Sequence, residues 1–249
     1  SFLLMMLMLA GLGLREFYDL SERGGFPGRP WQGTLAGMGM VTGVFLLLAL
    51  PVNPVPEQVP LFQLCFLSFF IMAMGVRHIF LDDAQGKLGV TIMGVAYVAI
   101  LLNFVQLIRF EHGPWFLLFF FVVTKASDTG AYLLGSLIGR HKMMPVVSPG
   151  KTWEGFAGAI LLSVAAAGAF VHFGGDRFVG MNMTHALIVG AVLGVGAVFG
   201  DLVESKLKRE AGAKDSGCFI PGIGGVLDLL DSLLFNAPIM YLYLKFGLS

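Results

Sequence analysis

Long apolar runs separated by short polar connections make up most of this chain. A helix needs about 20 apolar residues to cross the hydrocarbon core of a bilayer. Eight runs are long enough and predict transmembrane helices, at residues 1–19, 34–51, 60–80, 88–108, 115–138, 155–173, 184–207 and 226–246. The connections between them are rich in turn-forming glycine and proline. The pattern therefore predicts an all-α fold, a polytopic transmembrane helical bundle.

The first apolar run starts at Ser1, with no basic segment before it and no small-residue cleavage pattern after it. A signal peptide needs both features. We therefore interpret residues 1–19 as a truncated first span.

Composition supports a membrane protein independently of the pattern. The chain is 56% hydrophobic and 13% charged, with a mean hydropathy of +0.81, whereas soluble domains carry about 25% charged residues. The formal net charge is zero, which argues against nucleic acid as a partner. Cys65 and Cys218 lie far apart and lack metal-ligand spacing, so we expect both to be small packing residues.

The distribution of lysine and arginine predicts the orientation. Connections on one side carry twelve of these residues and those on the other side carry three, while one lies within a span. Because basic connections stay in the cytoplasm, we expect the twelve-residue side to face it. The twelve are Arg15, Arg23, Arg29, Arg77, Lys87, Arg140, Lys142, Lys151, Lys206, Lys208, Arg209 and Lys214.

Polar residues within the spans divide the chain into two predicted domains. Residues 1–110 contain few of them and are predicted to form an amino-terminal transmembrane scaffold. Residues 111–249 carry three polar clusters and are predicted to form a catalytic transmembrane domain.

The first cluster lies inside the fifth span. Asp128 follows Lys125 by three residues, so both share one helix face and can neutralise each other. That pairing explains the charges. It does not explain the adjacent Thr129 and Gly130, whose small size reduces the width of the helix and exposes polar groups of its backbone. We interpret Asp128 as a candidate metal ligand, with simple ion pairing as the alternative.

The second cluster is the connection before the sixth span, with Ser148, Lys151 and Thr152. Hydroxyl groups and an ammonium group beside a helix amino terminus suit phosphate recognition. The spacing is not that of a P-loop. Ordinary helix capping by Ser148 or Thr152, with Glu154 in the first turn, is the alternative reading.

The third cluster places two pairs of acids at membrane depth. Asp201 and Glu204 share one face of the seventh span, and Asp228 and Asp231 repeat that spacing on the eighth. Charges there are costly unless they are stabilised, and grouped carboxylates suit a hard divalent cation. Basic residues follow the first pair at Lys206, Lys208, Arg209 and Lys214. Carboxylates for a metal beside cations for phosphate indicate phosphoryl or nucleotidyl transfer.

Residues 205–231 closely resemble the signature of the phosphatidate cytidylyltransferases, also called CDP-diglyceride synthetases. That signature runs Ser, Lys-Arg, Lys-Asp, Pro-Gly-x-His-Gly-Gly and Asp-Arg-x-Asp. The matching residues are Ser205, Lys208, Arg209, Lys214, Asp215, Gly217, Pro221, Gly222, Gly224, Gly225, Asp228 and Asp231. Residues 148–155 and 128–132 resemble two further elements of the family. By these motifs the resemblance covers residues 115–249.

The resemblance implies transfer of a cytidylyl group from CTP to phosphatidate, which gives CDP-diacylglycerol and pyrophosphate. It implies Mg²⁺, with room for a second metal ion, in a bacterial inner-membrane protein whose site faces the cytoplasm, and it implies a homodimer. Implied catalytic residues are Asp201, Asp228, Asp231, Lys214 and Asp215, and the metal ligands are Asp201, Asp228, Asp231 and Asp128. Implied substrate-binding residues are Ser148, Lys151, Thr152, Ser205, Lys208, Arg209, Gly222, Gly224 and Gly225.

Two positions depart from the signature. Ile223 replaces the histidine before the glycine pair, and Leu229 replaces the arginine after the first aspartate. These changes leave open a catalytically impaired paralogue or a related CTP-dependent lipid enzyme. From another class, an ion-coupled transporter would also use intramembrane acids, although it would not explain the phosphate-binding chemistry on one side.

Overall fold

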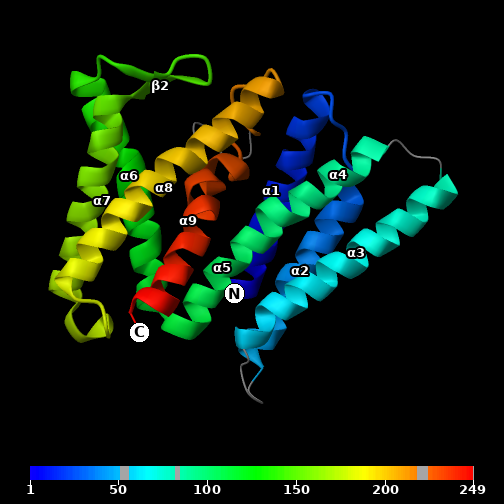
Figure 1. Ribbon diagram of the computed structural model, residues 1–249, viewed down its shortest axis with the longest axis horizontal. Coiled ribbons are helices and arrows are strands. Elements are labelled where there is room, and N and C mark those ends of the chain that lie inside the picture. The colour runs from blue at the N-terminus through cyan, green and yellow to red at the C-terminus, as the bar shows by residue number, and fades with distance from the viewer. Residues whose placement is uncertain (51–55, 82–84, 218–223, 249) are drawn as a thin grey trace. The chain divides into compact units, whose positions relative to one another are not determined.

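The computed structural model describes residues 1–50, 56–81, 85–217 and 224–248. Helices dominate the described residues, and a single β-hairpin interrupts them (Figure 1). The helices are α1 (Phe2–Arg23), α2 (Pro30–Ala49), α3 (Val59–Leu81), α4 (Gln85–Gly94), α5 (Leu101–Leu107), α6 (Pro114–Ile138), α7 (Trp153–Gly174), α8 (Met183–Glu210) and α9 (Val226–Gly247). Short 3-10 segments lie at Pro56–Gln58 and Gly175–Arg177, and π-helical segments flank α5 at Val95–Ile100 and Ile108–His112.

The all-α transmembrane prediction is confirmed. Within the described ranges, seven helical stretches are long and apolar enough to cross a membrane. They are Pro30–Ala49, Pro56–Arg77, Gly86–His112, Pro114–Ile138, Trp153–Arg177, Met183–Glu210 and Val226–Gly247. The predicted first span is also a helix, α1, but it is not among the seven. Its second half carries Arg15, Glu16 and Asp19, which interrupt the apolar run.

The chain divides into two compact units. The first unit contains Ser1–Phe110 and Leu207–Leu230, and the second contains Glu111–Lys206 and Asp231–Ser249. The division at residue 110 coincides with the predicted domain boundary, whereas Leu207–Leu230 group with the amino-terminal helices. The assignment of scaffold and catalytic roles to residues 1–110 and 111–249 stays a prediction.

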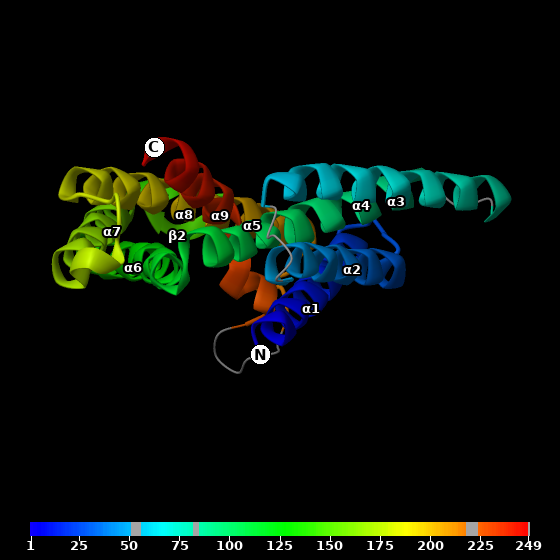
Figure 2. The same ribbon diagram turned by 90° about the horizontal axis from the view of Figure 1, so that it is seen from below.

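In the first unit, α1 packs along α2, and α2 packs against α3 (Figure 2). Tyr18 of α1 is buried against α2 and α4, and its hydroxyl donates a hydrogen bond to the Thr91 carbonyl at 2.8 Å. A Cβ atom added at Gly33 or Gly94 would collide with the Tyr18 ring. These glycines therefore let α2 and α4 approach α1 closely.

In the second unit, glycines set the spacing of the helices. Gly130 of α6 and Gly158 of α7 face each other so closely that a Cβ on either would meet the other's carbonyl oxygen. On α8, Gly194 lies against α7, while Gly196 and Gly200 lie against α9. Small residues at such crossings are typical of membrane helix packing. Gly130, predicted to expose polar backbone, instead serves this contact.

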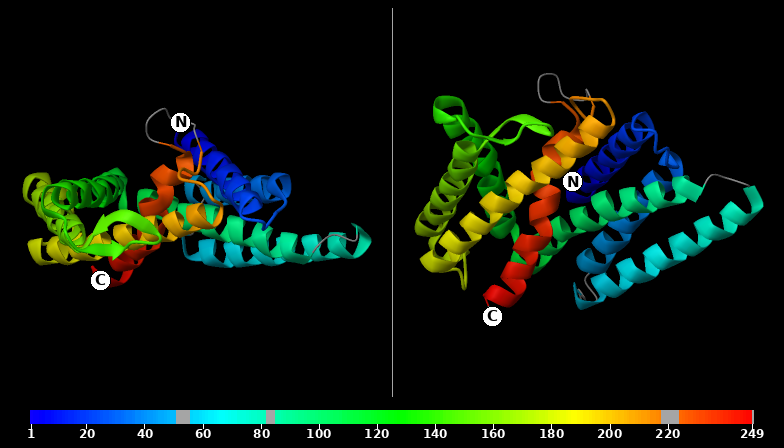
Figure 3. Two further views of the ribbon diagram at one scale, coloured as in Figure 1. Left: turned by 90° about the horizontal axis from the view of Figure 1, so that it is seen from above. Right: turned by 45° about the horizontal axis from the view of Figure 1, so that its top comes forward.

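A small antiparallel hairpin joins α6 to α7, where the sequence predicted a loop. Strand β1 (Lys142–Met144) pairs with β2 (Ser148–Thr152), with Lys142 opposite Thr152 (Figure 3). At its base, Glu154 of α7 accepts hydrogen bonds from the backbone N–H groups of Arg140 and His141. Glu154 therefore anchors the residues that precede β1 to the amino terminus of α7.

Candidate functional site

Three carboxylates converge where α8 and α9 cross in the second unit. Oxygen atoms of Asp201, Glu204 and Asp231 all lie within 4.8 Å of one another. Glu204 is fully buried and Asp231 is buried, while Asp201 is partly exposed. A Cβ at Gly200 would lie 2.7 Å from the Asp231 carbonyl oxygen. The absence of a side chain at Gly200 therefore allows the approach of the helices that groups these acids.

The hairpin contributes a cation to this cluster. The ammonium group of Lys151 on β2 lies 2.8 Å from Oδ2 of Asp201 and donates to the Val198 carbonyl at 3.0 Å. The Ser205 hydroxyl donates to the other oxygen of Asp201 at 3.1 Å. Both oxygens of Asp201 are thus oriented by neighbouring side chains, one of them through a charge-assisted hydrogen bond.

Helix α6 contributes a second cation. The ammonium group of Lys125 lies 3.0 Å from both Oδ2 of Asp128 and the Ser232 hydroxyl. The same group is 4.0 Å from Oδ1 of Asp231. The predicted pairing of Lys125 with Asp128 is therefore present. Lys125 also links α6 to Asp231 and Ser232 of α9, where that helix enters the second unit.

The charges of this cluster suit a divalent cation. Asp128, Asp201, Glu204 and Asp231 supply four carboxylates, against the two ammonium groups of Lys125 and Lys151. Fully ionised, the cluster carries an excess of two negative charges in a partly buried setting. Oxygen-only ligands with such an excess match the preference of hard divalent cations. The residues present therefore fit a divalent cation.

A buried polar network lies beneath the cluster. The side-chain amide of Asn236 on α9 donates to the Thr124 hydroxyl of α6 at 3.2 Å and to the Leu193 carbonyl of α8 at 2.9 Å. The Ser127 hydroxyl of α6 donates to the Gly194 carbonyl at 3.2 Å. These bonds tie together the three helices that carry the acids and Lys125.

A separate set of contacts surrounds Asp228 in the first unit. Its Oδ1 lies 2.6 Å from the ammonium group of Lys208. Its Oδ2 accepts hydrogen bonds from the backbone and hydroxyl of Ser216 and from the backbone of Gly225, at 3.0, 2.9 and 2.7 Å. Both oxygens are engaged by the protein. Asp228 therefore links Ser216 to Gly225, and its predicted role as a metal ligand stays a prediction.

Glu16 of α1 joins this second set. Its carboxylate accepts hydrogen bonds from the backbone N–H groups of Val226 and Leu227 at 3.0 and 2.7 Å. The Ser216 hydroxyl lies 3.1 Å from Oε2 of Glu16. A buried acid from the predicted scaffold thus reaches the signature segment, about 200 residues away in sequence.

Other predicted site residues have varied surroundings. The Thr152 hydroxyl caps α7 by accepting from the Gly155 N–H at 3.1 Å, which matches the alternative reading of that loop. Ser148 lies in β2, and Arg209 donates to the Ala213 carbonyl at 3.3 Å. Lys214 and Asp215 are exposed.

The signature glycines differ in what the structure describes of them. Gly224 has a φ of +111°, which favours glycine. A Cβ at Gly225 would meet Ser216 Oγ and Glu16 Oε2. Gly222 and Ile223 lie outside the described residues. Leu229, which replaces the family arginine, is partly buried on α9.

Five residues of these two clusters were not among the predicted site residues: Lys125, Glu204, Ser232, Glu16 and Ser216. Glu204 carried a signal, because it shares a helix face with Asp201. Ser232 and Glu16 carried weaker ones: a hydroxyl beside Asp231, and an acid next to Arg15 at the end of an apolar run. Only tertiary contacts identify Glu16, because its partners are distant in sequence.

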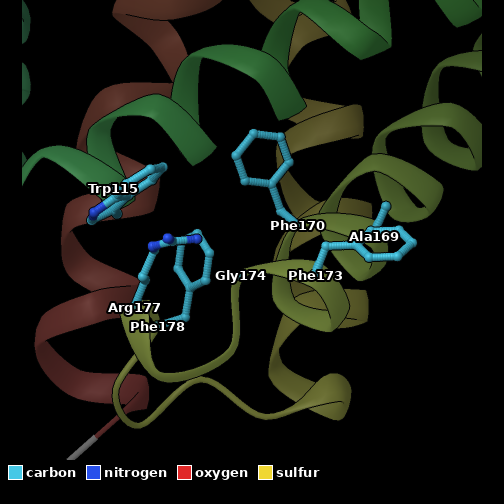
Figure 4. A pocket seen from close by; sticks show the side chains of 7 residues that line it. All are labelled: Trp115, Ala169, Phe170, Phe173, Gly174, Arg177 and Phe178. Atoms are coloured by element: carbon cyan, nitrogen blue, oxygen red, sulfur yellow. The ribbon is translucent and has the colours of Figure 1, made fainter.

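At the end of α7 away from the hairpin, the second unit contains an aromatic pocket (Figure 4). The guanidinium of Arg177 lies 4.6 Å from the centre of the Trp115 ring, within range of a cation–π interaction. Phe178, which also lines the pocket, is buried and its ring packs against that of Phe170. No predicted site residue lines this pocket.

Comparison with known proteins extends the resemblance to the whole chain. The family model of the cytidylyltransferases matches residues 1–247. The phosphatidate cytidylyltransferase of Staphylococcus aureus (strain COL) is 35% identical over 218 residues, which cover 85% of this chain and 78% of that protein. Proteins of the same name from Staphylococcus haemolyticus and Staphylococcus epidermidis are 36% and 37% identical. These matches cover 82% and 83% of this chain, and 79% and 78% of the relatives.

Proposed function

Because this chain belongs to the cytidylyltransferase family, we propose that it transfers the cytidylyl group of CTP to phosphatidate. A phosphate oxygen of the lipid attacks the α-phosphorus of CTP and forms the new P–O bond of CDP-diacylglycerol. The bond between the α-phosphorus and the oxygen that bridges to the β-phosphate breaks, and pyrophosphate leaves. The proposal rests above all on the grouped carboxylates of Asp201, Glu204 and Asp231 beside Lys151 and Lys125.

Phosphate is already a nucleophile, so this reaction needs no covalent enzyme intermediate. Catalysis then depends on positioning and on neutralisation of charge. Asp201, Glu204 and Asp231 would hold Mg²⁺, with Asp128 as a further ligand. When bound, the metal would offset the negative charge of the reacting phosphates.

The lysines of the cluster have a different task from the metal. Lys151 and Lys125 orient the carboxylates of Asp201 and Asp231 and offset part of their negative charge before substrate arrives. Arg209 is exposed in the last turn of α8, and Lys214 is exposed just after the helix. Both offer positive charge to the triphosphate or to the phosphatidate headgroup. Lys208 pairs with Asp228, and Asp228 accepts a hydrogen bond from the backbone of Ser216. These contacts fix the chain two residues after Lys214.

The location proposed for the site follows from its substrates. CTP is polar and enters from the cytoplasm, whereas phosphatidate keeps its acyl chains in the membrane. The twelve basic residues on one side of the spans support a cytoplasmic orientation. We place the protein in the bacterial inner membrane as a homodimer, with CTP, phosphatidate and membrane lipid, and no nucleic acid, as its partners.

The alternatives are not favoured. An ion-coupled transporter would account for the intramembrane acids but not for membership of a nucleotidyltransferase family. An impaired paralogue is disfavoured because the carboxylate cluster is intact despite Ile223 and Leu229.

A direct assay tests this proposal. Purified protein in detergent micelles is given phosphatidate, labelled CTP and Mg²⁺, and CDP-diacylglycerol formation is followed. We expect product from the wild type, none after EDTA treatment, and none from Asp231→Asn. The matched control Asp176→Asn removes the same charge from an exposed position of the same unit and should stay active. Folded wild-type protein that makes no product would overturn the proposal.

A further inference from the structure

The residue before helix α9, Gly225, has no side chain with which to cap the helix. The first N–H groups of a helix lack partners within the helix and need an outside acceptor. Gly225 precedes Val226, the first residue of α9, and contributes no acceptor of its own. The acid three residues on, Asp228, satisfies the Gly225 N–H at 2.7 Å. The next N–H groups are satisfied by residues outside the helix.

Glu16 and Ser216 supply these outside acceptors. Glu16 accepts from the N–H groups of Val226 and Leu227, one for each of its oxygens. The Ser216 hydroxyl oxygen accepts from the Asp228 N–H at 3.3 Å. The negative charge of Glu16 also interacts favourably with the positive end of the helix dipole. The first turn of α9 is thus capped by residues of α1 and of the segment after α8.

The two acids share one hydroxyl. Ser216 Oγ lies 3.1 Å from Glu16 Oε2 and 2.9 Å from Asp228 Oδ2. Its single proton serves one carboxylate at a time, so a change at Glu16 alters what Asp228 receives. Glu16 and Asp228 are therefore linked through Ser216 as well as through the helix amides.

The glycines around this cap leave room for Glu16. A Cβ at Gly225 would meet the Glu16 carboxylate, and one at Gly217 would lie 2.5 Å from its Oε1. Gly225 has no positive φ, so backbone conformation alone does not require glycine there. Space for the side chain of Glu16 is a physical reason for both glycines.

We propose that Glu16 is a positioning residue for nucleotidyl transfer, which acts through Ser216 and the first amides of α9 to fix Asp228 and the turn that follows it. Asp231 lies one helical turn after Asp228, so the same cap sets the start of the helix that carries both acids. The inference rests on the proposed function, which gives these acids their role. It assigns a part in catalysis to a helix that the sequence predicted to be scaffold.

Two substitutions test the cap. Glu16→Gln keeps the size of the side chain, but its NH₂ group would face one of the two backbone N–H groups. Ser216→Ala removes the shared hydroxyl and keeps the bonds from Glu16 to the helix. The matched control is Glu22→Gln, which removes the same charge from an exposed position of the same helix.

We expect each cap variant to lower kcat/KM by about 10-fold or more and to raise the Mg²⁺ concentration needed for half-maximal rate, as supporting residues of metal sites do. The control should match the wild type. Because the two residues act as one unit, the double variant should lose little more than the worse single variant. Hydrogen exchange of a peptide containing residues 226–228 should be faster in both single variants than in the control.

The outcomes separate this inference from the proposed function. A wild type without activity contradicts the proposed function, whereas an active wild type with unaffected cap variants contradicts the inference. Faster exchange with unchanged kinetics also contradicts it, since the cap would then be structural only. Additive losses in the double variant would show that Glu16 and Ser216 act separately. If Glu16→Gln fails to fold, Ser216→Ala decides by the same kinetics and exchange.

Discussion

The ammonium group of Lys151 lies 2.8 Å from the Asp201 carboxylate and is only 17% exposed. This ion pair ties the hairpin between α6 and α7 to the acidic face of α8. Without this contact the side chain of Lys151 would have many rotamers open to it, because its four-carbon stem is flexible. The pair therefore fixes a cation beside the proposed metal site before substrate binds.

Lys151→Met should lower kcat/KM by about 10–100-fold, the usual effect of losing a supporting contact of a metal site. The reason is the loss of positive charge at Asp201, and the substitution keeps most of the side-chain length. The measurement is steady-state CDP-diacylglycerol formation in micelles. Lys142→Met on the same hairpin, where the lysine is exposed, is the control. Equal rates in the two variants would mean that the contact with Asp201 is dispensable.

Mg²⁺ should raise the melting temperature of the wild type, because a ligand that binds only the folded state stabilises it. Asp201→Asn and Asp231→Asn should remove most of this rise, since each deletes a proposed ligand. The measurement is thermal unfolding in detergent with and without EDTA. Asp176→Asn should keep the full effect of Mg²⁺. A rise that persists in both cluster variants would place the metal elsewhere.

Lys125→Met should reduce activity, because it leaves Asp231 and Asp128 without their shared cation. Adding Asp128→Asn to this variant should recover stability, since it removes one of the repelling carboxylates. It should not recover activity if Lys125 also orients Asp231 and Ser232. Rates and melting temperatures of the single and double variants check this. Full recovery of the rate by the double variant would reduce Lys125 to a partner of Asp128.

Gly200→Ala should destabilise the protein by about 1–3 kcal/mol, as overpacking does. The added methyl group would press on the Asp231 carbonyl at 2.7 Å and on Phe235 Cβ at 2.8 Å. Activity should fall with it, because the crossing of α8 and α9 groups the acids. Gly168→Ala on α7 is the control, since its Cβ would make ordinary contacts at 3.5 Å or more. Unfolding of both variants in detergent is the measurement, and equal stabilities would contradict the packing role of Gly200.

The sequence was sufficient for the membrane fold and for the chemical type of the site. Helices longer than 20 residues follow from apolar runs, because a lipid environment requires each segment to satisfy its own backbone. The spacing of Asp201 with Glu204 placed both carboxylates on one face of the helix. The signature from Ser205 to Asp231 indicated the family that the comparisons confirm.

The sequence was not sufficient to predict which acids lie close together. The resemblance implied Asp201, Asp228, Asp231 and Asp128 as metal ligands, without Glu204. The structure groups Glu204 with Asp201 and Asp231, and it surrounds Asp228 with Lys208, Ser216 and Gly225. The sequence spacing is the same for both pairs, so only the packing of each helix face distinguishes them.

Local patterns thus determined the helices, the membrane setting and the residue types available for metal and phosphate. Tertiary structure decided their partners: Lys151 with Asp201, Lys125 with Ser232, and Glu16 with the first turn of α9. The helix repeat spans only about three to four residues, so the pattern of apolar residues that predicts a helix is visible in a short stretch of sequence. A hydrogen bond between Glu16 and Leu227 depends on how whole helices pack, and no repeat along the chain encodes that.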